Sequence, residues 1–186
     1  MKTTVCFVVL VFFAMGLNVL AKAAIKQIYP LKYERYIFEN AMANELDPYF
    51  VMAVIKAESN YNPTAHSGIA RGLMQITDDT AVWIADKMGL DFSESDIENP
   101  EINIKMGCYY LKYLSGLYDD PTVVLASYNA GMGNVSKWLE VDRFSEDSKT
   151  LFEIPFGETK NYVKKVARYE NVYKKLYGNR AFAYSK

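Results

Sequence analysis

Cysteine and histidine are nearly absent from this 186-residue chain, and their scarcity excludes several kinds of site. The chain has two cysteines, Cys6 and Cys108, and one histidine, His66. Cys6 lies in the apolar N-terminal stretch, so the rest of the chain has no internal disulfide and its fold must rest on packing. A zinc motif built on two histidines is excluded. The adjacency of His66 and Ser67 does not suggest a catalytic triad.

An excess of charge of either sign is also missing. Lysine and arginine number 21 and aspartate and glutamate 22, so the net charge is −1. A nucleic-acid partner is therefore not expected, because such partners require a basic surface. The chain contains no phosphate-binding loop and no dinucleotide fingerprint. Nucleotide-dependent chemistry is thus not indicated.

Only one long hydrophobic run is present, and it lies at the N-terminus. Residues 1–23 combine a positive start at Lys2, an apolar stretch over residues 5–20 and the small-residue pattern Ala21-Lys22-Ala23. This pattern is typical of an export signal with a cleavage site. An uncleaved membrane anchor is the alternative, although about 16 apolar residues is fewer than the roughly 20 that span a bilayer. We expect an exported, extracytoplasmic protein with a signal peptide or an N-terminal membrane anchor at residues 1–23.

The remaining sequence predicts helix after helix. Helix-start signals recur at Asp47-Pro48, Thr77-Asp78, Asn99-Pro100 and Asp120-Pro121. Residues 142–150 are polar and predict a loop, and no segment shows the alternation of a strand. On the helix after Pro100, helical spacing predicts a buried side formed by Ile102, Met106, Tyr109, Tyr110, Tyr113, Leu114 and Leu117. The fold class is therefore all-α.

Glu58 ends the apolar stripe of the helix that begins at Asp47-Pro48. Val51, Val54, Ile55 and Glu58 stand at i, i+3, i+4 and i+7, so they share one helix face. A carboxyl group in such a place is a solvated residue at a helix end, a hydrogen-bonded buried residue or an acid with a raised pKa. Burial disfavours the ionised form, which lets a glutamate act as a general acid near neutral pH.

Three segments resemble the signature of the soluble-lytic-transglycosylase (SLT) type of peptidoglycan lytic transglycosylase. Residues 58–67 match E-S-x-[FY]-N-P-x-A-x-S, and residues 72–75 match G-L-M-Q. Residues 127–131 are similar to A-Y-N-A-G, and residues 154–163 to I-P-F-x-E-T-[RK]-x-Y-V. Two departures are a segment from Ser67 to Gly72 that is one residue short and two aspartates where the family has a proline.

This resemblance implies a lysozyme-like (goose-type/SLT) catalytic domain over residues 30–178, followed by a C-terminal tail at 179–186. It implies that Glu58 acts alone, first as acid and then as base, on the glycan strands of peptidoglycan. Cleavage between N-acetylmuramic acid and N-acetylglucosamine then forms a 1,6-anhydro ring without water. No cofactor and no metal are implied, and we expect a monomer.

The resemblance also assigns six residues to substrate binding: Ser67, Met74, Gln75, Tyr128, Asn129 and Glu158. It implies that Met74 and Gln75 line the cleft and that Tyr128 approaches the sugar or hydrogen-bonds Glu58. Asn129 is expected to brace backbone. Ordinary structural roles stay open for some of them. Ser67 could cap a turn, Met74 could pack in the core, and Glu158 could stabilise a helix N-terminus.

Two other functions stay open. A hydrolase of the same fold would use Asp78 or Asp79 as a second carboxylate to activate water, although both stand at a predicted helix start, where acids are favoured. A non-catalytic glycan-binding component of a secretion apparatus is the other alternative. The intact motif around Glu58 argues against it.

Overall fold

The computed structural model describes residues 2–178, and the tail expected at 179–186 lies outside the described residues. The all-α fold class is confirmed: within residues 2–178 there are eight α-helices, one 3-10 helix and three strands of two residues each. Their bounds are α1 Lys2–Ile28, α2 Glu34–Ala43, α3 Pro48–Ser59, β1 His66–Ser67, β2 Ala70–Arg71, β3 Ile76–Thr77, α4 Asp78–Met88, η1 Glu94–Glu98, α5 Pro100–Leu117, α6 Pro121–Ala130, α7 Met132–Leu139 and α8 Gly157–Tyr177.

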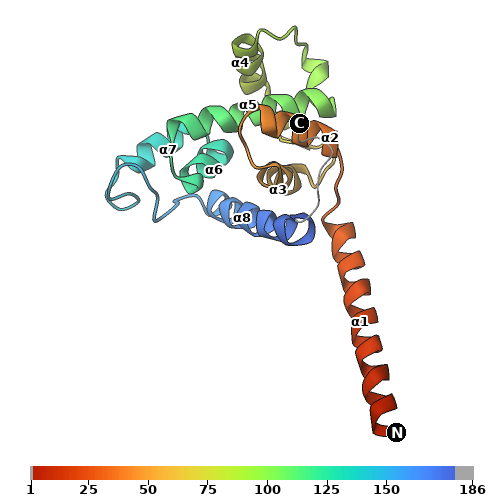
Figure 1. Cartoon of the computed structure of the whole chain (residues 1–186). Coiled ribbons are helices and arrows are strands. Elements are labelled where there is room, and N and C mark those ends of the chain that lie inside the picture. The colour runs from red at the N-terminus through yellow and green to blue at the C-terminus, as the bar shows by residue number, and fades with distance from the viewer. Residues whose placement is uncertain (1, 179–186) are drawn as a thin grey trace.

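Helix α3 lies at the centre of the domain, with α2 and α5 on one side of it and α8 on the other (Figure 1). It begins as predicted, because the Asp47 carboxylate accepts a 2.8 Å hydrogen bond from the Tyr49 N–H. Every residue from Val51 to Ile55 is fully buried, and Lys56 is only 8% exposed. Neighbouring segments therefore surround α3 on all sides. The single apolar stripe predicted from sequence covers only part of its buried surface.

The long helix α1 projects from the domain, and its C-terminal end is fixed against α8 (Figure 1). The Tyr29 ring packs edge-on against Tyr169 and Tyr173, at 5.6 and 5.5 Å between ring centres. The Tyr177 hydroxyl donates to the Tyr29 carbonyl at 2.7 Å, and the Lys56 ammonium to the Ile28 carbonyl at 2.6 Å. Among the described residues, no helix is both long enough and apolar enough to cross a membrane.

A small antiparallel sheet, in the order β1-β2-β3, follows α3. The sequence did not predict it, because strands of two residues are too short to show alternation. The adjoining turn packs on η1 at Gly72, whose φ is +81° and where a Cβ atom would lie 2.7 Å from the Ile97 carbonyl. The buried Asn103 amide of α5 accepts from the Met74 N–H at 2.8 Å and donates to the Ile97 and Arg71 carbonyls at 2.7 and 3.2 Å. One amide therefore ties the segment from Arg71 to Met74 to α5.

The residues that α5 buries differ in part from those that the helical spacing predicted. Met106 and Leu114 are buried as expected, but Tyr113 is 36% exposed and Leu117 is 50% exposed. The buried face is instead made by small and aliphatic residues, with Cys108 and Leu111 fully buried.

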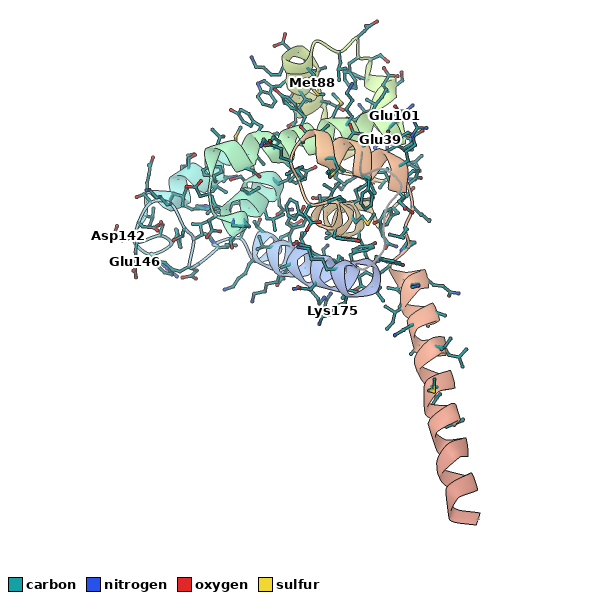
Figure 2. All side chains as sticks on the ribbon, viewed as in Figure 1. Glu39, Met88, Glu101, Asp142, Glu146 and Lys175 are labelled. Carbon is teal, nitrogen blue, oxygen red and sulfur yellow. The ribbon has the colours of Figure 1, made fainter. Side chains whose placement is uncertain are left out.

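The polar stretch at residues 142–150 is a loop, as predicted. Figure 2 shows Asp142 and Glu146 at its outer edge, away from the central helices. The Asp147 carboxylate closes the loop by accepting hydrogen bonds from the Lys149 and Thr150 N–H groups at 2.8 and 2.7 Å. These bonds lower the pKa of Asp147 to about 2.

Candidate active site

Glu58 stands in the last turn of α3, and its half-buried side chain faces a cavity of about 380 Å³. The end of α3, strand β1, the end of α6 and the first half of α8 supply the walls. The lining residues are Ala57, Glu58, Ser67, Asn129, Glu158, Asn161, Tyr162 and Lys165. The cavity thus collects polar groups from four separate parts of the chain around one carboxyl group.

The surroundings of Glu58 raise the pKa of its carboxyl group from 4.5 to about 7. Burial is the main cause, because it disfavours the charged form, and the negative charge of Glu158 adds to the rise. The Tyr162 hydroxyl and the Lys165 ammonium act in the opposite direction. Near neutral pH the carboxyl group therefore exists in both protonation states, as a residue that gives and then takes a proton must.

Lys165 reaches the cavity from α8. Its ammonium donates a 2.9 Å hydrogen bond to the carbonyl of Ala57 and lies 5.9 Å from the centre of the Tyr162 ring. The last carbonyls of a helix lack intrahelical donors and carry partial negative charge. Lys165 therefore caps the end of α3 and places a positive charge beside Glu58.

Ser67 and Gln75 act as a pair. Ser67 lines the cavity, and its hydroxyl donates to the Gln75 side-chain oxygen at 2.5 Å. The Gln75 amide donates to the carbonyls of Ala65 and Gly72, both at 2.9 Å. Gln75 is not among the residues that line this cavity. It braces the loop that carries Ser67, and the short segment between Ser67 and Gly72 still brings Ser67 to Glu58.

Met74 lies in the core and not in the cleft, which corrects the expectation from sequence. Its side chain is 0% exposed and packs against Gly107 of α5, where a Cβ atom would lie 2.6 Å from the Met74 methyl carbon. A glycine at this point of α5 leaves the space that the thioether fills. Met74 therefore has no side-chain surface to offer a sugar.

Tyr128 lies near Glu58, but its hydroxyl donates to the Met74 carbonyl at 2.8 Å. Burial raises the pKa of the Tyr128 hydroxyl well above 10, and the negative charge of Glu58 raises it further. The hydroxyl therefore stays protonated and fixes the loop that carries Met74. Of the two contacts expected of Tyr128, the hydrogen bond to Glu58 is not made here.

Asn129 and Glu158 both line the cavity. The Asn129 side-chain oxygen accepts from the Thr159 hydroxyl at 2.8 Å, so it braces a side chain of α8 and not backbone as expected. Glu158 is exposed in the first turn of α8, where the helix dipole favours an acid. Its place at a helix N-terminus agrees with the structural interpretation, and its carboxyl group is the second one in the cavity.

Besides Ala57, three residues that line the cavity with polar side chains were missed from sequence: Asn161, Tyr162 and Lys165. Together with Glu158 they stand at i, i+3, i+4 and i+7, so they share one face of α8. That spacing was present in the sequence, but the apolar stripe through Tyr162 and Val166 hid it.

Asp78 and Asp79 do not line the cavity. Both are exposed in the first turn of α4, and Asp78 accepts from the Arg71 guanidinium, at 3.0 Å from Nε. His66 is also exposed, with its Nε2 2.8 Å from a Glu98 carboxylate oxygen. The structure therefore supports neither aspartate as a partner of Glu58.

The family described as the transglycosylase SLT domain matches residues 35–151. The soluble lytic murein transglycosylase of Escherichia coli K12 is 32% identical over 161 residues, which cover 84% of this chain and 25% of that protein. The membrane-bound lytic murein transglycosylase C of Haemophilus ducreyi is 26% identical over 76% of this chain and 45% of its own length.

A solved structure shares the fold. The X-ray structure of an inactive glutamate-to-glutamine mutant of the lytic transglycosylase Slt from Pseudomonas aeruginosa superposes with a TM-score of 0.71 at 27% identity. The match covers 88% of this chain and 28% of that one. This chain thus spans about a quarter of the length of its soluble relatives.

Proposed function

Because the chain belongs to the transglycosylase SLT domain family, we propose that it is a peptidoglycan lytic transglycosylase. It cleaves the β-1,4 bond between N-acetylmuramic acid and N-acetylglucosamine and leaves 1,6-anhydro-N-acetylmuramic acid ends. The observation that carries this proposal is the Glu58 carboxyl group, whose pKa of about 7 suits proton transfer in both directions.

In the first step the protonated Glu58 donates its proton to the glycosidic oxygen. The bond from C1 of the muramic acid to that oxygen breaks, and the leaving N-acetylglucosamine departs with a free hydroxyl group. Positive charge develops on the ring of the muramic acid, as in other glycoside cleavages. Glu58 is now ionised, and its charge is favoured by the Lys165 ammonium and the Tyr162 hydroxyl.

In the second step the Glu58 carboxylate takes the proton of the C6 hydroxyl group on the same muramic acid. The C6 oxygen then bonds to C1 and closes the anhydro ring, which returns Glu58 to its acid form. The nucleophile belongs to the substrate, so no water is consumed and the effective concentration of the nucleophile is high. One carboxyl group suffices for both proton transfers.

Glu158 is the second carboxyl group of the cavity, but we assign it no base role. It is exposed at the start of α8, where the helix dipole stabilises its negative charge. That charge raises the pKa of Glu58 and so favours the acid form that begins the reaction. We propose that Glu158 also contacts the glycan or its peptide stem.

The remaining binding roles follow from position. Ser67 and Asn129 line the cavity and offer hydroxyl and amide groups to the glycan. Gln75 and Tyr128 hold the loop on which Ser67 and Met74 stand. The substrate is the glycan strand of peptidoglycan, and no cofactor is needed for either proton transfer.

We further propose that the chain is exported and works outside the cytoplasm. Residues 1–23 serve as a signal peptide or an N-terminal membrane anchor, and residues 30–178 form the catalytic domain, which acts as a monomer. The apolar composition of residues 5–20 supports the first point. A relative named as membrane-bound is consistent with anchoring.

Glu58→Gln tests the assignment of the catalyst. The amide keeps the shape of the side chain but cannot deliver a proton, so cleavage of purified sacculi should fall by at least about 10²–10⁴-fold. The circular dichroism spectrum should be unchanged. If a folded Glu58→Gln protein kept more than about a tenth of the activity, Glu58 would not be the catalyst.

A further inference from the structure

One exposed face of α8 carries positive charge and no negative charge. Its residues stand at i, i+4, i+8, i+11 and i+15, and all of them are exposed: Lys160, Lys164, Arg168, Asn171 and Lys175. We call this row the basic face; it is about 22 Å long, at about 1.5 Å per helical residue. Within residues 2–178 none of its four cations forms an ion pair.

The acids of α8 lie on other sides of the helix. Glu158 lines the cavity of Glu58, and Glu170 pairs with Lys174. Like charges four residues apart repel each other, so the basic face lowers the stability of α8. The net charge of −1 therefore conceals a local excess of cations that an anionic partner would neutralise.

The N-terminal part of the chain has the same bias of charge. No acid precedes Glu34, and Lys22 and Lys26 are exposed in the C-terminal turns of α1. The Lys26 ammonium lies 5.6 Å from the centre of the Tyr177 ring, which brings the end of α1 beside the end of α8. Helix α1 projects outward past α8 (Figure 1), and Figure 2 shows Lys175 on the outer side of α8, toward which α1 projects.

We propose that the basic face of α8 docks on the surface of an anionic lipid bilayer, which α1 enters from the same side. This inference rests on the proposed export of the chain and not on its lytic activity. Each lysine or arginine close to an anionic bilayer is attracted to its surface. The apolar run of residues 5–20 is shorter than a full span, and a basic patch is a common second signal beside a weak apolar anchor.

Docking in this way would place the catalytic cavity next to the membrane. Asn161 and Lys165 line that cavity and lie on the face of α8 that adjoins the basic face. The basic face itself contributes no residue to the cavity. The domain can therefore rest on the bilayer while Glu58 remains accessible to glycan strands that lie close to the membrane.

Two other anionic partners fit the basic face less well. Single-stranded nucleic acids stack their bases on aromatic rings, and the basic face has no aromatic residue. Carboxylates on the peptides of peptidoglycan would meet cations that line the cavity, and none of the cations of the basic face does. A lipid surface needs only a row of exposed cations that is free of acids.

The docking is tested with the full chain reconstituted into vesicles. Asn171→Cys, at the centre of the basic face, carries a fluorophore in a chain with Cys6→Ser, and Cys108 is buried beyond reach of the label. The vesicles consist of phosphatidylcholine alone or of equal parts of phosphatidylcholine and phosphatidylglycerol, with a quencher on the lipid headgroups. Val82→Cys carries the control label, because it is exposed on α4, on the far side of the domain from α8 (Figure 1).

We expect the label at residue 171 to be quenched in the vesicles that contain phosphatidylglycerol and far less in phosphatidylcholine alone. High salt should reverse the quenching, because it screens the attraction. The label at residue 82 should stay unquenched. Lys164→Gln combined with Lys175→Gln should lower the ratio of docked to undocked domains about twenty-five-fold, or about fivefold for each cation.

A matched control removes the same charge from other helices. Lys87 and Lys137 are exposed on α4 and α7, so Lys87→Gln combined with Lys137→Gln should leave the docked ratio within about twofold of the parent. Circular dichroism should show the same helix content in both double variants and in the parent.

The proposal is overturned if the label at residue 171 is quenched equally in both kinds of vesicle, or if the Lys164 and Lys175 double variant docks as the parent does. Slower cleavage of lipid-free sacculi by that variant would assign the basic face to the wall and would also overturn it. So would tighter binding of a single-stranded oligonucleotide than of the anionic vesicles. Failure of the lytic function is separately visible, because the products released from sacculi are measured without lipid.

Discussion

Lys165 donates a 2.9 Å hydrogen bond to the carbonyl of Ala57, the residue that precedes Glu58. This bond joins α8 to the end of α3 and brings a positive charge to the wall of the cavity that Glu58 faces. The charged groups that act on the Glu58 carboxyl are Lys165, which lowers its pKa, and Glu158, which raises it. The protonation of Glu58 therefore depends on two residues of α8.

Lys165→Met should raise the pKa of Glu58, because the cation favours the ionised carboxylate. The acid form then persists to higher pH, so the alkaline limb of kcat/KM moves upward in pH. Lys165→Arg should restore the parent profile, since the charge is kept. The exposed neighbour Lys164 offers the matched control, and Lys164→Met should leave the profile in place. If the alkaline limb of the Lys165→Met profile did not move, Lys165 would act only as a cap of α3.

Glu58→Gln should stabilise the fold, increasingly so as the pH rises. The folded-state pKa of Glu58 lies above its ordinary value, so the folded protein binds more protons than the unfolded chain between pH 4.5 and about 7. Stability from this group is full below pH 4.5 and is lost as the pH passes the raised pKa. Urea unfolding should show the two proteins equal near about pH 4 and the variant about 1–3 kcal/mol more stable near about pH 8. A constant difference across that range would show that Glu58 is not desolvated.

Asp78→Asn and Asp79→Asn, singly and together, should retain activity within about twofold and lose at most about 1 kcal/mol of stability. Asp78 pairs with Arg71 at the protein surface, and neither aspartate lines the Glu58 cavity. Turnover of sacculi by the double variant, compared with its melting curve, checks this. Loss of turnover in a folded double variant would restore the hydrolase with a second carboxylate.

The sequence predicted the parts of the fold that depend on local chemistry. Asp47, Thr77, Asn99 and Asp120 each cap a helix through their side chains, as the spacing of polar residues and prolines indicated. Glu58 was found because a carboxyl group in an apolar stripe is anomalous on any helix. Signals of this kind are contained in one or two turns of a helix, so they can be recognised without knowledge of tertiary contacts.

The parts that the sequence did not reveal depend on contacts between distant segments. Lys165 was not singled out in the sequence, because only the approach of α8 to α3 makes it part of the site. Tyr113 was expected in the core because helical spacing identifies the apolar residues of a helix. It does not tell which of these residues a neighbouring helix covers, and Tyr113 is partly exposed. Met74 was placed in the cleft by resemblance, whereas the space left by Gly107 draws it into the core.

Digestion of sacculi in water enriched in ¹⁸O, followed by mass spectrometry of the released muropeptides, distinguishes the lytic reaction from hydrolysis. Glu58 is assigned both proton transfers, and no group in the cavity is assigned to activate water. We expect 1,6-anhydro products, about 18 Da lighter than hydrolytic products, with no heavy oxygen at C1 of the new muramic acid ends. Heavy oxygen at that carbon would mean that water attacked it, and would contradict the transglycosylase mechanism.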